Sequence, residues 1–203
     1  MSSTSPSAES GSRRVGLLGG SFDPIHHGHL IAAAAAREVL ALDEVRFVVA
    51  GRQPFKAAGH AATAEQRAAM VDAAIEGAEG FSVERAELDR PGPSYTVDTL
   101  RILTAREPSA RFVLLVGSDS ARHLPDWHEA AVLPVLAEIV VLSRPGTPVP
   151  SLPFPARVCA VPAVDVSSTA VRARVRQGLP VRWWVPEAVE EYVRTHRLYL
   201  DPV

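Results

Sequence analysis

Apolar residues recur along this chain in two alternating patterns, which predict a parallel β-sheet flanked by helices. Short runs rich in branched residues are typical of buried strands, and longer runs with apolar residues three and four positions apart are typical of helices. Their alternation indicates βαβ units, whose strands lie parallel in one sheet. We expect strands at residues 15–18, 45–50, 81–84, 112–116, 138–142 and 157–161, and helices at 30–40, 63–75, 96–106, 169–177 and 186–195.

These elements predict one α/β domain, a doubly wound, Rossmann-like parallel sheet with the strand order 3-2-1-4-5 and residues 157–161 as a candidate sixth strand. The Ser- and Gly-rich residues 1–12 have no apolar period and predict a disordered tail, which leaves residues 13–203 as the folded domain. In such sheets, ligands bind beyond the carboxyl ends of the strands, where the strand order reverses. The first strand ends at Gly19-Gly20 and the fourth at Gly117-Ser118-Asp119, so both ends should face one cleft.

Composition narrows the class of protein. The formal net charge of −2 and the pI near 6.4 argue against a general binder of nucleic acids or anionic membranes. No apolar stretch reaches the length of a membrane span. The single cysteine, Cys159, cannot form an internal disulfide, which fits a reducing compartment. We therefore expect a cytoplasmic protein with neither a nucleic-acid nor a membrane partner.

The residues that follow the first strand predict a phosphate site. Glycines at positions 19 and 20 let a bulky ligand approach the backbone, and Asp23-Pro24 marks a turn. A helix then begins near His26 and His29, which share a face, and its N–H groups and dipole favour an anion. A zinc site would lack a third ligand here, and a pair of solvated histidines would not explain the glycines. The pattern therefore favours a site for nucleotide phosphates.

A second candidate phosphate element is Val166-Ser167-Ser168-Thr169-Ala170-Val171-Arg172. Serine before a helix caps it, and the same hydroxyl and N–H groups can hold phosphate oxygens. Arg172 follows about one helical turn later, so its guanidinium can reach back and bind phosphate with two nitrogens. An ordinary capped helix with a solvated arginine fits these residues equally well.

Both segments resemble motifs of one superfamily. The stretch from Gly19 to His29 resembles the Gly-Gly-x-Phe-Asp-Pro-x-His-x-Gly-His segment of nucleotidyltransferases, with the core His26-His27-Gly28-His29. The serine element resembles their Ile-Ser-Ser-Thr-x-Ile-Arg segment. This resemblance implies transfer of a nucleotidyl group from a nucleoside triphosphate, with release of pyrophosphate, by a nucleotidyltransferase domain at residues 13–203.

Further motifs resemble those of bacterial nicotinate-nucleotide adenylyltransferases. Ser94-Tyr95-Thr96, with Thr99-Leu100, matches that family's Ser-Tyr-Thr-x-x-Thr-Leu, and Gly117-Ser118-Asp119 with Trp127 matches its Gly-x-Asp and tryptophan. The resemblance spans residues 14–200. In that family, the tryptophan stacks on the nicotinate ring and backbone groups near the Tyr-Thr pair read its carboxylate. From the residues alone, Trp127 could equally be a core or lid aromatic.

The resemblance implies that the chain joins ATP and nicotinate mononucleotide to give nicotinate adenine dinucleotide, a step of NAD biosynthesis. It assigns catalytic roles to His26, His29 and Arg172. It assigns ATP binding to Gly19, Gly20, Ser21, Phe22, His26, Gly28, His29, Gly117, Asp119, Ser167, Ser168 and Arg172, with Asp119 on the ribose. It assigns binding of the acceptor, nicotinate mononucleotide, to Lys56, Tyr95, Thr96 and Trp127. Mg²⁺ should arrive with ATP, because no paired carboxylates form an obvious metal site.

The chain departs from the family pattern at one place, and its residues leave more than one function open. Many members of the family carry Pro-Pro-His-Lys where this chain has Gln53-Pro54-Phe55-Lys56, so the lysine is present and the histidine is not. A pantetheine-phosphate adenylyltransferase would share the first motif without needing Tyr95 and Trp127. A nicotinamide-specific enzyme, or a non-catalytic nucleotide-binding regulator on the same fold, would share it too. The sequence also leaves a homo-oligomer open.

Overall fold

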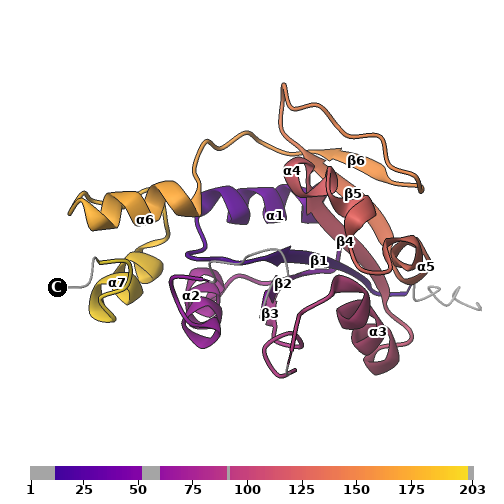
Figure 1. The fold of residues 1–203 in the computed structure, drawn as a ribbon, viewed down its shortest axis with the longest axis horizontal. Helices are drawn as coiled ribbons and strands as arrows, with labels where there is room; N and C mark the ends of the chain where they lie inside the picture. The colour runs from indigo at the N-terminus through magenta and orange to yellow at the C-terminus, as the bar shows by residue number, and fades with distance from the viewer. Residues whose placement is uncertain (1–11, 52–59, 91, 201–203) are drawn as a thin grey trace, which may run out of the picture.

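The chain folds around a single six-stranded parallel sheet. The computed structural model describes residues 12–51, 60–90 and 92–200. The strand order is β3-β2-β1-β4-β5-β6, which confirms the predicted order and adds the sixth strand at an edge (Figure 1). The strands are β1 (Arg14–Gly20), β2 (Glu44–Val49), β3 (Phe81–Glu84), β4 (Arg111–Gly117), β5 (Glu138–Ser143) and β6 (Arg157–Ala160).

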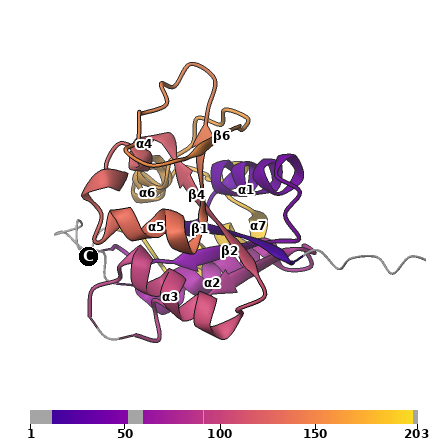
Figure 2. The same cartoon turned by 90° about the vertical axis from the view of Figure 1, so that its right-hand side faces the viewer.

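Helices cover both faces of this sheet. The longer ones are α1 (His27–Val39), α2 (Ala64–Ile75), α3 (Thr96–Arg106), α6 (Ser168–Arg176) and α7 (Glu187–Thr195). Between β4 and β5 lie the short α4 (Ser118–Ala121), η1 (Leu124–Asp126), η2 (Ala130–Val132) and α5 (Leu133–Leu136). Helices α1 and α3 lie on opposite sides of the sheet (Figures 1 and 2).

Each face of the sheet has its own buried core. On one face, side chains such as Phe47 of β2 and Leu115 of β4 pack with residues of α1, α2 and α7. On the other, Leu17 of β1 and Leu114 of β4 pack with α3 and with the short helices before β5. The adjacent positions Leu114 and Leu115 therefore point into opposite cores, as expected for a strand buried on both faces.

Several boundaries differ from the predicted ones, and each difference has a physical cause in the folded chain. Strand β1 continues beyond Leu18 through both glycines, because Gly19 and Gly20 pair with Val48 and Val49 of β2. Helix α1 begins at His27, which confirms the start that the first motif predicts and lies three residues before the start at Leu30 expected from the apolar period. The N–H of His27 donates to the carbonyl of Trp184 (3.1 Å), a contact from far along the chain that no local pattern indicates.

The predicted start of α2 is confirmed in detail. The Oγ1 of Thr63 accepts a hydrogen bond from the Gln66 N–H (3.2 Å), and the Gln66 side chain accepts one from the Thr63 N–H (2.9 Å). This reciprocal arrangement satisfies two N–H groups that a helix start leaves open. It fixes the start of α2 at Ala64.

Two expectations from the sequence are only partly covered by the structure. Residues 1–11 lie outside the described residues, so the tail and the domain boundary at residue 13 stay predictions. Within the ranges that the structure describes, no helix combines the length and apolar character needed to cross a membrane.

Candidate active site

A cavity of about 640 Å³ opens at the carboxyl ends of β1 and β4. These strands are direct neighbours, with Leu18 opposite Leu115, so the predicted juxtaposition of their ends is confirmed. The cavity is lined by seven of the residues that the resemblance assigns to ATP or to the acceptor: Gly19, Gly20, Ser21, Tyr95, Thr96, Gly117 and Trp127. It therefore joins the end of the first motif to the expected acceptor residues.

The glycines at the end of β1 have different surroundings. A Cβ on Gly20 would lie 2.7 Å from the ring of Phe22, which no real side chain tolerates, whereas a Cβ on Gly19 would meet open space. Phe22 itself has a φ of 49° and is 1% exposed, with its ring edge against His29 and Phe47. Any contact of Phe22 with a nucleotide would therefore come from its backbone.

His26 and His29 form a stacked pair at the start of α1. Their ring centroids are 3.7 Å apart at an angle of 23°, so the predicted shared face is confirmed. The backbone N–H of His26 donates to Nδ1 of His29 (3.3 Å). In a neutral imidazole the other nitrogen then carries the proton, so Nε2 of His29 is a hydrogen-bond donor. Nδ1 of the buried His26 has no hydrogen-bond partner among the described residues.

Burial keeps both histidines neutral. It lowers the pKa of His26 to about 4, with a further contribution from the charge of His27. It lowers the pKa of His29 to about 3, with a further contribution from His26. At neutral pH the pair can therefore donate hydrogen bonds without carrying a net charge.

These low pKa values predict a loss of stability in mild acid. An unfolded histidine binds a proton below about pH 6.5, whereas the folded pair binds one only near pH 4 and below. The unfolded state therefore holds more protons in this window, so the free energy of unfolding falls as the pH falls from 6.5 to 4. Each histidine contributes at most about 1.4 kcal/mol per pH unit.

Urea unfolding at pH 7 and at pH 5 measures this loss. We expect His26→Gln to show a smaller difference between the two pH values than the parent chain, because glutamine does not titrate. A matched control is His196→Gln, which replaces an exposed histidine outside the site. Equal pH differences for the parent chain and His26→Gln would contradict the role of burial.

The start of α6 packs directly against the first motif. The Ser168 hydroxyl donates to the carbonyl of Pro24 (2.8 Å), and Nη1 of Arg172 donates to the carbonyl of Asp23 (2.7 Å). Ser167 caps the helix by accepting from the Ala170 N–H (3.2 Å). Arg172 also reaches back to the Thr169 hydroxyl (3.4 Å), as its spacing predicts. The two candidate phosphate elements are therefore brought together, although neither Arg172 nor the histidine pair lines the cavity.

The sequence pattern indicates Asp23 only as a turn residue, whereas in the structure its side chain binds groups from two distant segments. Its buried carboxylate accepts hydrogen bonds from the N–H groups of Ala61 (2.8 Å) and Ala62 (3.1 Å) and from the Tyr199 hydroxyl (2.8 Å). Close by, Nε2 of His60 lies 3.2 Å from the Ser21 hydroxyl. The first motif is therefore held by the segment before α2 and by a tyrosine beyond α7.

Arg67 of α2 is a second residue that sequence patterns missed. It is 1% exposed, and its guanidinium donates to the carbonyls of Ser21 and Ala50, both at 2.7 Å. Burial lowers its pKa, while the charge of Asp23 opposes that shift. Arg67 thereby ties the turn after β1 to the end of β2.

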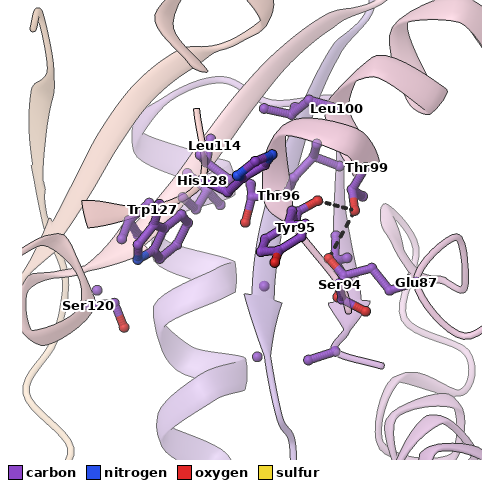
Figure 3. Close-up of a pocket in the computed structure, with 18 of the residues that line it drawn as sticks. Glu87, Ser94, Tyr95, Thr96, Thr99, Leu100, Leu114, Ser120, Trp127 and His128 are labelled. Atoms are coloured by element: carbon purple, nitrogen blue, oxygen red, sulfur yellow. Dashed lines mark hydrogen bonds between the residues drawn. The ribbon is translucent and has the colours of Figure 1, made fainter. Parts of the chain in front are cut away.

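Three of the four expected acceptor residues, Tyr95, Thr96 and Trp127, line the cavity and are called the acceptor wall below (Figure 3). Tyr95 precedes the first residue of α3, and its ring packs against His128 with centroids 4.4 Å apart. Trp127 follows η1 and is half-buried against the α3 side of the core. The rings of Tyr95, Trp127 and His128 therefore all line the cavity.

Asp119, like the histidine pair and Arg172, does not line this cavity. The Asp119 side chain is exposed and lies 3.3 Å from Nη2 of Arg144. Lys56 lies outside the described residues, as does the rest of the segment where this chain departs from Pro-Pro-His-Lys. Neither observation tests their assignment to ribose and acceptor, which stays a prediction.

The described residues offer a metal ion no site of their own. Across residues 12–51, 60–90 and 92–200, no three His, Cys, Asp or Glu side chains lie in an arrangement that could hold one.

Comparison with known proteins shows the family. The Cytidylyltransferase-like family matches residues 17–174. A protein of Thermus thermophilus named "probable nicotinate-nucleotide adenylyltransferase" is 49% identical over 186 residues, covering 92% of this chain and 99% of that protein. A protein of the same name from a Synechococcus strain is 40% identical, covering 94% and 96%.

Solved structures share the fold. Plasmodium falciparum nicotinic acid mononucleotide adenylyltransferase complexed with NaAD superposes with a TM-score of 0.76, at 17% identity, over 92% of this chain and 97% of that one. At that identity the likeness shows the fold alone. The same agreement in architecture holds for the complex of that Plasmodium protein with APC, which has a TM-score of 0.71.

Proposed function

Since the chain belongs to the Cytidylyltransferase-like family, and within it to the nicotinate-nucleotide adenylyltransferases, we propose that it joins ATP and nicotinate mononucleotide to give nicotinate adenine dinucleotide and pyrophosphate. The observation that carries this proposal is the cavity that links the glycine end of β1 to the wall of Tyr95 and Trp127. Both substrates need such a shared space, because the acceptor phosphate must meet the α-phosphate of ATP.

The chemistry is a direct displacement. A phosphate oxygen of nicotinate mononucleotide forms a bond to the α-phosphorus as the bond from that phosphorus to the bridging oxygen of the β-phosphate breaks. The acceptor phosphate is already ionised at neutral pH, so no side chain has to remove a proton. Catalysis therefore rests on holding the reactants in line and on stabilising the charge that develops on the α-phosphate.

We assign that stabilisation to the histidine pair. The Nε2–H of His29 donates to an α-phosphate oxygen, and His26, whose Nδ1 lacks a partner in the described chain, lies stacked beside it. A donor that is fixed in place before the reaction loses no energy in reorienting as charge develops. The low pKa of His29 fits this use as a neutral donor rather than as a proton carrier.

We assign the departing pyrophosphate to the start of α6. The first turn of that helix and Arg172 lie against the turn that carries Asp23 and Pro24. Two hydrogen bonds use only part of the donor capacity of Arg172, because a guanidinium has five N–H groups. Its remaining donors, with the positive end of α6, suit the β- and γ-phosphates.

We assign the nicotinate ring of the acceptor to the face of Trp127 and its carboxylate to the neighbourhood of Tyr95 and Thr96. The pyridine ring of the acceptor mononucleotide carries a positive charge, which is attracted to the face of an indole. The start of α3, an eleven-residue helix, supplies backbone N–H groups and a positive dipole end for the carboxylate. Mg²⁺ enters as part of the substrate, as its complex with ATP.

Pyrophosphate release tests this assignment. We expect the rate with ATP, Mg²⁺ and nicotinate mononucleotide to exceed the rates with nicotinamide mononucleotide and with phosphopantetheine at least about tenfold, because only the first carries the ring carboxylate. A preference for either other acceptor would retain adenylyl transfer and reject the acceptor pocket. Binding of ATP without turnover of any acceptor would reject the proposed enzyme.

A further inference from the structure

Glu87 is a buried carboxylate beside the acceptor wall, and the reaction described above does not use it. It lies in the segment between β3 and α3, is 9% exposed and lines the cavity. A carboxylate in such a place is costly unless donors surround it. Its partners therefore indicate what it holds in place.

Those partners come from two separate elements. One carboxylate oxygen accepts from the Thr99 hydroxyl in the first turns of α3 (3.0 Å). The other accepts from the N–H of Gly51, just beyond the end of β2 (3.4 Å). Glu87 thus bridges the end of β2 and the helix that begins at the acceptor wall.

Thr99 extends this bridge to Tyr95. Its hydroxyl lies 3.3 Å from the carbonyl oxygen of Tyr95, as well as 3.0 Å from Glu87 (Figure 3). The same carbonyl accepts the backbone N–H groups of Asp98 (3.1 Å) and Thr99 (3.2 Å), which form the first turn of α3. If the Glu87 carboxylate moved, the Thr99 hydroxyl would move with it and would shift the backbone of Tyr95.

The backbone at Gly51 is closely packed against its neighbours, so no larger residue fits at this position. A Cβ at that position would lie 2.4 Å from the Glu87 carbonyl oxygen and 2.7 Å from the Ser94 hydroxyl. The backbone after β2 therefore touches both Glu87 and the residue that precedes Tyr95. Gly51 is therefore linked to the start of α3 in two ways. It donates a hydrogen bond to Glu87, and it packs against Ser94.

We propose that Glu87 is a positioning residue for the acceptor: through Gly51 and Thr99 it fixes residues 94–96 in the place where the acceptor is bound. This inference rests on the proposed function. A carboxylate suits the role because both of its oxygens accept hydrogen bonds, so it can satisfy two donors on opposite sides. The amide of glutamine has one accepting oxygen, and it must turn an NH₂ group toward one of those donors.

Steady-state kinetics with Thr99→Val and Glu87→Gln test the proposal. We expect each variant to raise the KM for nicotinate mononucleotide roughly tenfold, because each loses a hydrogen bond to a charged group. The KM for ATP should stay within about twofold of the parent value, because neither change touches the phosphate elements. Thr104→Val is the matched control. It removes a hydroxyl from the same helix, one that donates to the Leu100 carbonyl (2.8 Å) and does not line the cavity, and it should leave both KM values unchanged.

The outcomes separate this proposal from the proposed function. A parent chain that does not use nicotinate mononucleotide rejects the function, whatever the variants do. An active parent chain with variants whose acceptor KM is unmoved, or whose two KM values rise together, rejects the positioning role. If Glu87→Gln does not fold, Thr99→Val compared with Thr99→Ser, which keeps the hydroxyl, decides the same question.

Discussion

Replacing His29 with alanine should lower kcat by about two to three orders of magnitude, the effect expected for the loss of a fixed donor to developing charge. Nδ1 of His29 accepts the His26 N–H, so Nε2 is the donor that alanine removes. Pyrophosphate release at saturating concentrations of both substrates measures the change. His29→Gln, which keeps an N–H donor at similar reach, should retain more activity than His29→Ala.

The remote histidine at position 196 provides the control. It is exposed, stacks on Tyr192 and makes no contact with the first motif, so His196→Ala should retain the parent kcat. Loss of activity in His29→Ala together with a lowered melting temperature would point to a folding defect instead. A His29→Ala enzyme that keeps more than about a tenth of the parent kcat would contradict the assigned role.

Replacing Arg67 with methionine should lower the free energy of unfolding by about 3 kcal/mol or more. Methionine fills much of the space, but the carbonyls of Ser21 and Ala50 lose their charged donor inside the protein. A buried acceptor without a partner carries the full cost of its lost hydration. Urea unfolding at pH 7 measures the difference.

Arg85→Met is the matched control for that measurement. Arg85 is more exposed and pairs with Glu65 at the surface, so its replacement should change the free energy of unfolding by less than about 1 kcal/mol. Equal losses for the two variants would show that the backbone hydrogen bonds of Arg67 contribute little beyond ordinary packing.

Local patterns are sufficient to predict most of the fold. The boundaries of β3 and α3 agree with the predicted ranges, and the capping residues of α2 are recognisable, because each depends on neighbours in the sequence. The four short helices between β4 and β5 escape prediction, since segments of three or four residues are too short to show a period. The motifs indicate candidate residues for phosphate and acceptor, and the strand order brings the ends of β1 and β4 to one end of the sheet.

The supporting residues cannot be predicted in the same way. Asp23 and Tyr199 are hydrogen-bonded across 176 positions, and no spacing rule links them. Arg67 lies in a helix whose other charged residues suggest a solvated side, and only the folded chain shows that it is buried. From the sequence, Glu87 is indistinguishable from a surface charge. Only the structure shows that it is buried and hydrogen-bonded to Gly51 and Thr99. These residues act through distant partners, which periodicity does not reveal.

The hydrogen bonds that hold the first motif in place also determine when it can be completed during synthesis of the chain. The segment with Asp23 and His29 is made early, but the groups that hold it, Arg172 and the hydroxyls of Ser168 and Tyr199, are made late. Because chains are made from the amino end and domains fold as units, a growing chain carries this first motif without these hydrogen bonds until residue 199 is free of the ribosome. The segment that we propose to bind ATP is thus made early, and the groups that hold it in place are made last.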